Sequence, residues 1–254
     1  MNIKSQIKRT LGSFKSKFNA VKSRINKKNN LNRFLKLNPR YDKEFSFSES
    51  IVHYKTRNEV YLYYRYYYNH RLPKALKDHR LYIEMHQKGF GEPAFHAMWW
   101  KLILEFKPVN VLEIGVYRGQ VVSLWTMIAS LLQYEVNVYG ISPFSSCGDL
   151  VSKYLNNLDY YEDVKQTFVN LDLKQPTFVR GFSNDEKAID LIRSKVWDMI
   201  YIDGGHDYED ILFDYKLCIE NTRIGGLIIL DDASLYTDYK PDSFSFAGHP
   251  GPSR

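Results

Sequence analysis

The second half of the chain alternates between short apolar runs and amphipathic stretches, a pattern typical of strands and helices in turn. Runs rich in Val, Ile and Leu occupy 109–115, 136–142, 177–183, 197–203 and 225–232. Stretches with helical periodicity lie between them, at 119–132, around 148–158, at 161–170, 184–194 and 208–221. Continuously apolar runs separated by helices predict a parallel sheet covered on both faces. Right-handed crossovers then give an α/β, doubly wound Rossmann-like domain over 109–254.

Residues 41–108 predict a mostly helical lead-in to this domain. The segment 54–70, YKTRNEVYLYYRYYYNH, is dominated by tyrosine. Interleaved Tyr and Arg can stack on bases or sugars, but we interpret the run as a packing segment with its hydroxyls at the surface. A helix is expected over 94–106 after Glu92-Pro93, and His96 is interpreted as a packed histidine of that helix.

The positive charge of the chain belongs to its first segment, 1–40, which holds twelve Lys and Arg and no Asp or Glu. The remaining residues have 23 basic and 29 acidic side chains, so no specific nucleic-acid partner is expected for the body. Apolar side chains recur at helical spacing within 1–28. This pattern predicts an amphipathic helix that lies on an anionic membrane surface, at the inner face. The alternative is a solvated helix that docks on the body or on a second subunit of a homo-oligomer.

Composition excludes an integral membrane protein, because no apolar run has the length needed to cross a bilayer. The chain begins without the apolar stretch of a secretory signal. Cys147 and Cys218 lie far apart and have no metal-binding or redox spacing, which fits a reducing cytoplasm.

The loop after the first apolar run has two glycines at the spacing G-x-x-x-G, Gly115 and Gly119. The first permits a sharp turn, and the second lets the next helix begin close to the strand. The spacing matches neither the dinucleotide fingerprint G-x-G-x-x-G nor a P-loop. Its place, between the first strand and a helix, is what points to a ligand site.

Ionisable residues follow the last two apolar runs. Asp203 ends one run, His206 comes three residues later, and Asp231-Asp232 end the next. Ligands of such sheets bind beyond the carboxyl ends of the strands, where the strand order reverses. Clustered carboxylates repel one another, and a hard cation such as Mg²⁺ removes that cost. Each residue also has a structural alternative: a turn at Asp203, a surface position for His206, and a helix cap at Asp231-Asp232.

Two stretches carry a family resemblance that spans about residues 90–250. VLEIGVYRGQVVSLW resembles motif I of class I S-adenosylmethionine-dependent methyltransferases. WDMIYIDGGHDYEDILFDY…GGLIILDD resembles the metal-dependent, macrocin O-methyltransferase-like sugar methyltransferases and relatives named after cephalosporin hydroxylase. The resemblance implies a cofactor site that also includes Asp203. It implies that the methionine part is bound by Glu113, Gly115, Tyr117 and Gly119, the ribose by Ser142, and the adenine by Phe182 and Ser183.

The resemblance also implies a mechanism. Asp203, Asp231 and Asp232 would surround a divalent ion, with Mg²⁺ expected, and Asp203 and His206 would be catalytic, His206 as the base. The ion would lower the pKa of an acceptor hydroxyl on a sugar, glycosylated natural product or polysaccharide. The methyl group would then move in line from sulfonium to oxygen. Where many methyltransferases have an acid for the ribose, this chain has Ser142.

Two other functions stay open on the sequence alone: a nucleotide-dependent oxidoreductase, and a catalytically silent binding or scaffold protein. The missing dinucleotide fingerprint counts against the first. A complete fold of this kind adds two strands after the fifth, but 22 residues follow Asp232. We therefore expect a truncated chain or an abbreviated sheet. His249 lies in the Gly/Pro-rich end segment, which could close over a substrate, and has no assigned role.

Overall fold

The computed structural model describes residues 29, 33, 36, 39–146, 154–155, 157–236 and 248–254. The chain divides into two compact units, Met1–Glu44 and Phe45–Arg254. In the first unit, residues 29, 33 and 36 are helical and a 3₁₀ turn, η1, spans Pro39–Tyr41. The amphipathic helix expected over 1–28 lies outside the described residues. Within the described ranges, no helix is both long enough and apolar enough to cross a membrane.

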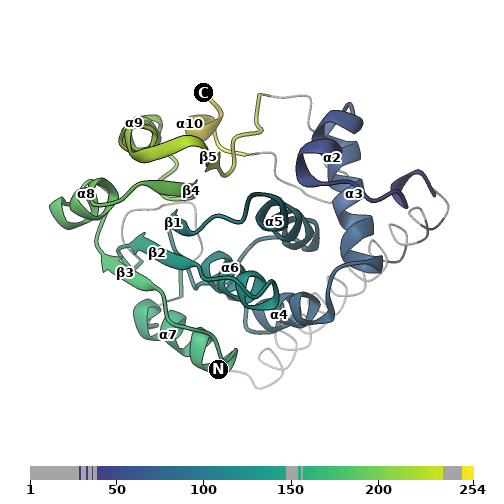
Figure 1. Ribbon diagram of the computed structural model, residues 1–254. Helices are drawn as coiled ribbons and strands as arrows, with labels where there is room; N and C mark the ends of the chain where they lie inside the picture. The colour runs from purple at the N-terminus through teal and green to yellow at the C-terminus, as the bar shows by residue number, and fades with distance from the viewer. Residues whose placement is uncertain are drawn as a thin grey trace, which may run out of the picture. The chain divides into compact units, whose positions relative to one another are not determined.

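The second unit contains a five-stranded sheet in the order β3-β2-β1-β4-β5, with every neighbouring pair parallel (Figure 1). The sequence predicted each of these strands and the doubly wound α/β class, and both are confirmed. The strands are β1 Asn110–Ile114, β2 Asn137–Ser142, β3 Thr177–Arg180, β4 Trp197–Ile202 and β5 Thr222–Leu230.

Helices connect the strands and precede them. They are α2 Phe47–His53, α3 Arg57–His70, α4 Lys74–Met85, α5 Pro93–Phe106, α6 Gln120–Leu131, α7 Tyr160–Asn170, α8 Glu186–Arg193, α9 Tyr208–Asn221 and α10 Pro250–Ser253. The helix expected around 148–158 falls partly on residues outside the described ranges, and 154–155 and 157–158 are not helical.

The strand order reverses between β1 and β4, which makes this the switch point of the sheet. The chain runs from β1 outward through α6, β2 and α7 to β3, and then returns by α8 to β4 on the other side of β1. In Figure 1, α8 and α9 lie on one side of the sheet and α5 and α6 on the other. Two connections that leave a switch point in opposite directions open a crevice at the carboxyl ends of its strands.

Side chains alternate between two cores, as the strand period requires. Leu112 and Ile114 of β1 and Ile200 and Ile202 of β4 belong to the buried cluster that includes α8 and α9. On the opposite face, the Tyr201 ring lies 5.2 Å from that of Trp99 in α5 and 6.2 Å from that of Trp125 in α6. The side chains within the strands therefore pack into the two cores, and the residues that follow the strands line the edge of the sheet.

The lead-in helices continue this second core. Helix α3 packs on α5, and α5 packs on α6. The tyrosine-rich segment is a packing segment, as predicted, but the expectation of surface hydroxyls was wrong for two of its rings. The Tyr63 hydroxyl accepts from the backbone N–H of Phe45 at 3.0 Å, and the Tyr64 hydroxyl bonds to Ser50 at 2.8 Å, both in buried positions. Buried phenols need such partners, so the lead-in is tightly ordered.

Candidate active site

Backbone hydrogen bonds hold the carboxyl ends of neighbouring strands side by side. Gly115 donates to the carbonyl of Ile141 at 2.9 Å, Asp203 donates to Ile114 at 2.8 Å, and Asp231 donates to Ile202 at 3.0 Å. These bonds continue the ladder one residue past β1, β4 and β5. The sheet therefore brings Gly115, Asp203 and Asp231 together at the switch point, although they lie far apart in the sequence.

Two glycines shape the loop from β1 to α6. Gly115 has φ +101°, and a Cβ there would lie 1.9 Å from the backbone oxygen of Asp203. Gly119 has φ +85° and precedes the first residue of α6. A side chain at Gly115 would push the ends of β1 and β4 apart, so the close approach of the two strands requires glycine.

Glu113 lies buried beneath this loop. Its carboxylate accepts from the backbone N–H of Val122 in α6 at 3.2 Å. Burial raises the pKa of Glu113 to about 8, and the nearby Asp231 carboxylate adds to the rise. The hydrogen bond from Val122 opposes both effects without cancelling them.

Asp203 and Asp231 form the buried part of an acidic cluster with Glu113. Burial raises the pKa of Asp203 well above its usual range, and the charges of Asp231, Glu113 and Asp232 raise it further. Burial and the charge of Asp232 also raise the pKa of Asp231, which bonds to Tyr201 and Asp203. No ion pair with Lys or Arg forms at Glu113, Asp203 or Asp231 within the described ranges. The described residues thus gather carboxyl groups here without a Lys or Arg partner.

Asp232 turns away from this buried group. Its φ of +52° is a left-handed conformation, which aspartate tolerates better than most residues. Its Oδ2 lies 3.3 Å from Nε2 of His206 and 3.6 Å from Nε2 of His249, and the two imidazole rings are 4.0 Å apart. The backbone therefore divides the predicted ligand trio, all half-buried, between the bonded pair Asp203 and Asp231 and a separate position, Asp232, beside the two histidines.

In the described part of the chain, His206, Asp232 and His249 are the one group of three or more His, Cys, Asp or Glu residues whose donor atoms all lie within 4.8 Å of one another. We refer to them as the His–Asp–His cluster. The sequence analysis singled out the first two but left His249 without a role. Neither periodicity nor a motif marks it, and 16 residues separate it from Asp232 in the sequence.

The residues expected to bind ribose and adenine lie at the same edge, at the ends of β2 and β3. Ser142 is buried, and Gly181 donates to its carbonyl at 3.0 Å. Phe182 is 45% exposed just after β3. The Ser183 hydroxyl bonds to the buried carboxylate of Asp214 in α9. These positions border the switch point, and their roles in cofactor binding stay predictions.

Tyr117 lies in an aromatic group beside the loop. Its ring is 5.2 Å from that of Phe90, 5.7 Å from Tyr154 and 5.6 Å from Tyr160. Burial raises the pKa of the Tyr117 hydroxyl to about 12, with the neighbouring Tyr160 adding to the rise. This residue therefore anchors the loop to α7.

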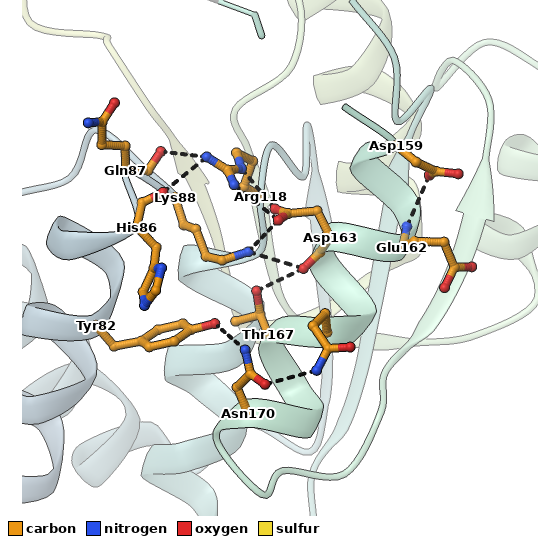
Figure 2. A network of polar contacts seen from close by, with 11 residues as sticks. Tyr82, His86, Gln87, Lys88, Arg118, Asp159, Glu162, Asp163, Thr167 and Asn170 are labelled. Carbon is orange, nitrogen blue, oxygen red and sulfur yellow. Dashed lines mark hydrogen bonds and ion pairs between the residues drawn. The ribbon is translucent and has the colours of Figure 1, made fainter. Parts of the chain in front are cut away.

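The sequence analysis missed an ionic network that fixes the same loop (Figure 2). Arg118 donates from Nε and Nη2 to the two carboxylate oxygens of Asp163 in α7, at 2.8 and 3.0 Å. Lys88 lies 2.7 Å from the same carboxylate, and Arg118 also donates to the carbonyls of His86 and Gln87. We refer to Lys88, Arg118 and Asp163 as the matched triad. It ties the loop to both α7 and the end of α4.

Two surface hollows lie at the other end of the sheet. One, of about 460 Å³, is lined by residues 193–196 and 220–224. The other, of about 90 Å³, is lined by Thr126 together with residues 136–139 and 174–177. Both are at the amino ends of the strands, and neither contains a predicted site residue. They therefore give no alternative to the edge where the acids converge.

Residues 112–233 match a family of proteins described as a methyltransferase domain. The match begins within β1 and ends just after Asp232, so it covers β2 to β5, most of β1 and the acidic cluster. This part of the chain is therefore similar to a methyltransferase domain. The similarity agrees with the resemblance that the sequence motifs carry. The finer subgroup, with its sugar acceptors, stays a prediction.

Similar proteins are remote in sequence. A protein of Acanthamoeba polyphaga mimivirus is 25% identical over 135 residues, which are 52% of this chain and 53% of that one. The chain thus spans about half the length of this curated relative. An O-methyltransferase from Bacillus cereus in complex with SAH is 14% identical, with a TM-score of 0.49 over 67% of this chain and 72% of that chain. An SAH-bound methyltransferase from Podospora anserina is 13% identical, with a TM-score of 0.47 over 67% and 70%.

Proposed function

We propose that this protein transfers the methyl group of S-adenosylmethionine to the oxygen of an acceptor hydroxyl. The observation that carries the proposal is the convergence of Glu113, Asp203 and Asp231 beside the glycine loop at the switch point, held there by backbone bonds. Ligands of doubly wound sheets bind at this place, and the family match covers all of its residues.

The acidic cluster suits a cationic ligand. S-Adenosylmethionine has a positively charged sulfonium and an α-ammonium group, and buried carboxylates that no Lys or Arg neutralises would attract both. Glu113 and Asp203 are the predicted contacts for this cofactor, together with Gly115 and Gly119. Gly115 lies close to the backbone of Asp203 and has no side chain. A ligand can therefore lie directly against the backbone of the loop.

The His–Asp–His cluster suits the acceptor. Oxygen is a poor nucleophile until its proton is lost, so the acceptor hydroxyl needs a base or a metal ion nearby. His206 is the predicted base, and Asp232 at 3.3 Å would orient its ring. Methyl transfer then depends mainly on alignment of the sulfonium carbon with the hydroxyl oxygen.

A divalent cation fits this end of the sheet. Its charge would offset the repulsion among Asp203, Asp231 and Asp232, which the sequence analysis predicts as its ligands. When bound, such an ion would lower the pKa of a coordinated hydroxyl. Asp203, Asp231 and Asp232 would hold such an ion through their carboxylate oxygens.

The family resemblance bears on the acceptor, and the basic first segment bears on the cellular setting. The resemblance to sugar O-methyltransferases favours a hydroxyl on a sugar, a glycosylated product or a polysaccharide. The basic segment 1–40, outside the described ranges except for a few residues, is proposed to contact an anionic membrane surface.

The proposal is tested by titration calorimetry of the purified chain with S-adenosylmethionine and with NAD, followed by transfer of labelled methyl to a panel of glycosides. We expect binding of S-adenosylmethionine and not of NAD, and label in an alkali-stable methyl ether. Binding of NAD would favour an oxidoreductase. Binding of neither cofactor would favour a silent scaffold and would contradict the proposal.

A further inference from the structure

The donor atoms of the His–Asp–His cluster are spaced as ligands of one metal ion are. Two ligands of a tetrahedral ion with bonds of about 2.1 Å lie about 3.4 Å apart. Oδ2 of Asp232 lies 3.3 Å from one imidazole Nε2 and 3.6 Å from the other. All three donor atoms lie within 4.8 Å of one another, so one ion could reach each of them.

Residues 248–251, which lead into α10 and form its first turn, are fitted closely enough to fix the position of His249. A Cβ at Gly251 would lie 2.0 Å from the backbone oxygen of His206. A Cβ at Gly248, which has φ +130°, would lie 2.2 Å from the backbone oxygen of Asp232. Only glycine allows these approaches, so the segment is shaped to bring His249 against the other two residues.

Hydrogen bonds hold the same segment in place. The backbone N–H of His249 donates to the carbonyl of Asp232 at 2.9 Å. The Ser253 hydroxyl donates to that carbonyl at 3.1 Å and accepts from the N–H of Leu235 at 3.0 Å. The backbone on both sides of the imidazole is thus anchored to the residues after β5. Such preorganisation lowers the cost of assembling a metal site.

The cluster is also within reach of the solvent. The side chains of His206 and His249 are 16% and 14% exposed, and that of Asp232 is 28% exposed. An ion can therefore enter, and the carboxyl groups of Asp203 and Asp231 are bonded to each other next to Asp232.

We propose that His206, Asp232 and His249 bind one divalent ion of the imidazole-preferring class, Zn²⁺ or Fe²⁺, in preference to Mg²⁺. Imidazole nitrogen suits these ions, whereas Mg²⁺ prefers an all-oxygen shell. Three protein ligands leave at least one coordination position, as in catalytic zinc sites. The inference rests on the proposed function only in giving that position to the acceptor hydroxyl.

This assignment changes the role of His206 from free base to metal ligand and adds His249, which the sequence analysis left without a role. Lowering the pKa of the acceptor hydroxyl is then the task of the ion. The assignment also replaces the ligand trio that the resemblance implies: Asp232 remains a ligand, whereas Asp203 and Asp231 are neighbours outside the coordination shell.

The test is titration calorimetry of the full chain, freed of metal with a chelator, with Zn²⁺ and Mg²⁺ in separate experiments. We expect one equivalent of Zn²⁺ to bind and Mg²⁺ to bind much more weakly. The His249→Ala variant should lose Zn²⁺ affinity by about 100-fold or more, since even outer-shell partners of a metal are worth about 10- to 100-fold. The matched control is His70→Ala, at an exposed histidine of α3.

A second readout covers variants that fold poorly. Co²⁺ in a site with imidazole ligands gives visible absorption, which should appear in the wild type and change in His249→Gln while the circular dichroism stays the same. Zn²⁺ binding that survives in His249→Ala would overturn the inference. So would Mg²⁺ binding that is lost in Asp203→Asn but unchanged in His249→Ala. None of these readouts requires methyl transfer, so failure of the proposed activity would leave this result standing.

Discussion

The matched triad and the acidic cluster are two buried ionic groups at the same loop, and they are built in opposite ways. In the triad, Asp163 meets two cations, Lys88 and Arg118. In the cluster, Glu113 and Asp203 meet only further acids and hydrogen-bond donors. Figure 2 shows the triad, in which each charged atom points to a partner.

The pKa directions express the same contrast. Burial alone would raise the pKa of Asp163, but hydrogen bonds from Arg118 and Lys88 hold it below its usual range. The pKa values of Glu113, Asp203 and Asp231 are raised instead. In the matched triad, each charged group is paired within the protein, so the triad stabilises the fold. The carboxyl groups of the acidic cluster have no cationic partner and can bind a cationic ligand, which is why such groups mark functional sites.

The largest expected effect is on activity, in the Asp203→Asn variant. Removing this charge from the cluster should lower kcat/KM for methyl transfer by roughly 1000-fold, because both cofactor and acceptor depend on it. Circular dichroism should be unchanged, since an uncharged amide relieves repulsion. The matched control is Asp190→Asn, at an exposed position of α8. Normal activity in the Asp203→Asn variant would show that Asp203 has no role in the active site.

The next largest effect is on stability, in Asp163→Asn. Breaking the triad leaves Lys88 and Arg118 buried without their carboxylate, and loss of one partner of a buried pair costs about 3–5 kcal/mol. Urea unfolding followed by fluorescence measures the free energy of unfolding.

Glu162→Gln is the matched control, because it removes an exposed ion pair with Lys165 on the same helix. Such exposed pairs contribute less than about 1 kcal/mol. Equal losses in Glu162→Gln and Asp163→Asn would contradict the distinction between matched and solvated charges.

His206→Ala should slow methyl transfer by about 100-fold while leaving the affinity for S-adenosylmethionine unchanged. His206 belongs to the acceptor side of the proposed site, so its loss should appear in kcat at saturating cofactor. Single-turnover kinetics measure the transfer rate and calorimetry the cofactor affinity. A large loss of cofactor affinity would place His206 on the donor side instead.

The smallest expected effect belongs to Asp214, a buried carboxylate whose pKa burial raises to about 6 from 3.8. The folded state holds this proton more tightly than the unfolded state, so the contribution to stability is complete below about pH 4 and is lost as pH rises through 6. Asp214→Asn should flatten this part of the pH dependence and raise the free energy of unfolding at pH 7 by about 2 kcal/mol. An unchanged pH dependence of unfolding between pH 4 and 7 would contradict the assignment.

The sequence was sufficient for the fold because period and composition act locally. The apolar runs became β1 to β5, and the stretch predicted over 208–221 is α9 with the same bounds. Gly115 could be assigned to a tight turn because few residues adopt its backbone conformation. Asp203 and Asp231 could be placed together because parallel strands end at one edge.

The remaining features depend on contacts that no local pattern records. His249 reaches Asp232 through the packing of Gly248 and Gly251, which reads in the sequence only as a Gly/Pro-rich segment. The divergence of Asp231 and Asp232 depends on a single left-handed φ. The partners of Arg118 come from α4 and α7, so its burial could not be inferred from the loop alone.

The most direct test of the account is a crystal structure of the chain with S-adenosylhomocysteine. We predict that the ligand lies beyond the carboxyl ends of β1 and β4, with its amino-acid part against Gly115 and within hydrogen-bond distance of Glu113 or Asp203. A ligand bound at the amino ends of the strands, or ordered density there with the acidic cluster left to solvent, would contradict the claim that unmatched carboxylates mark the active site.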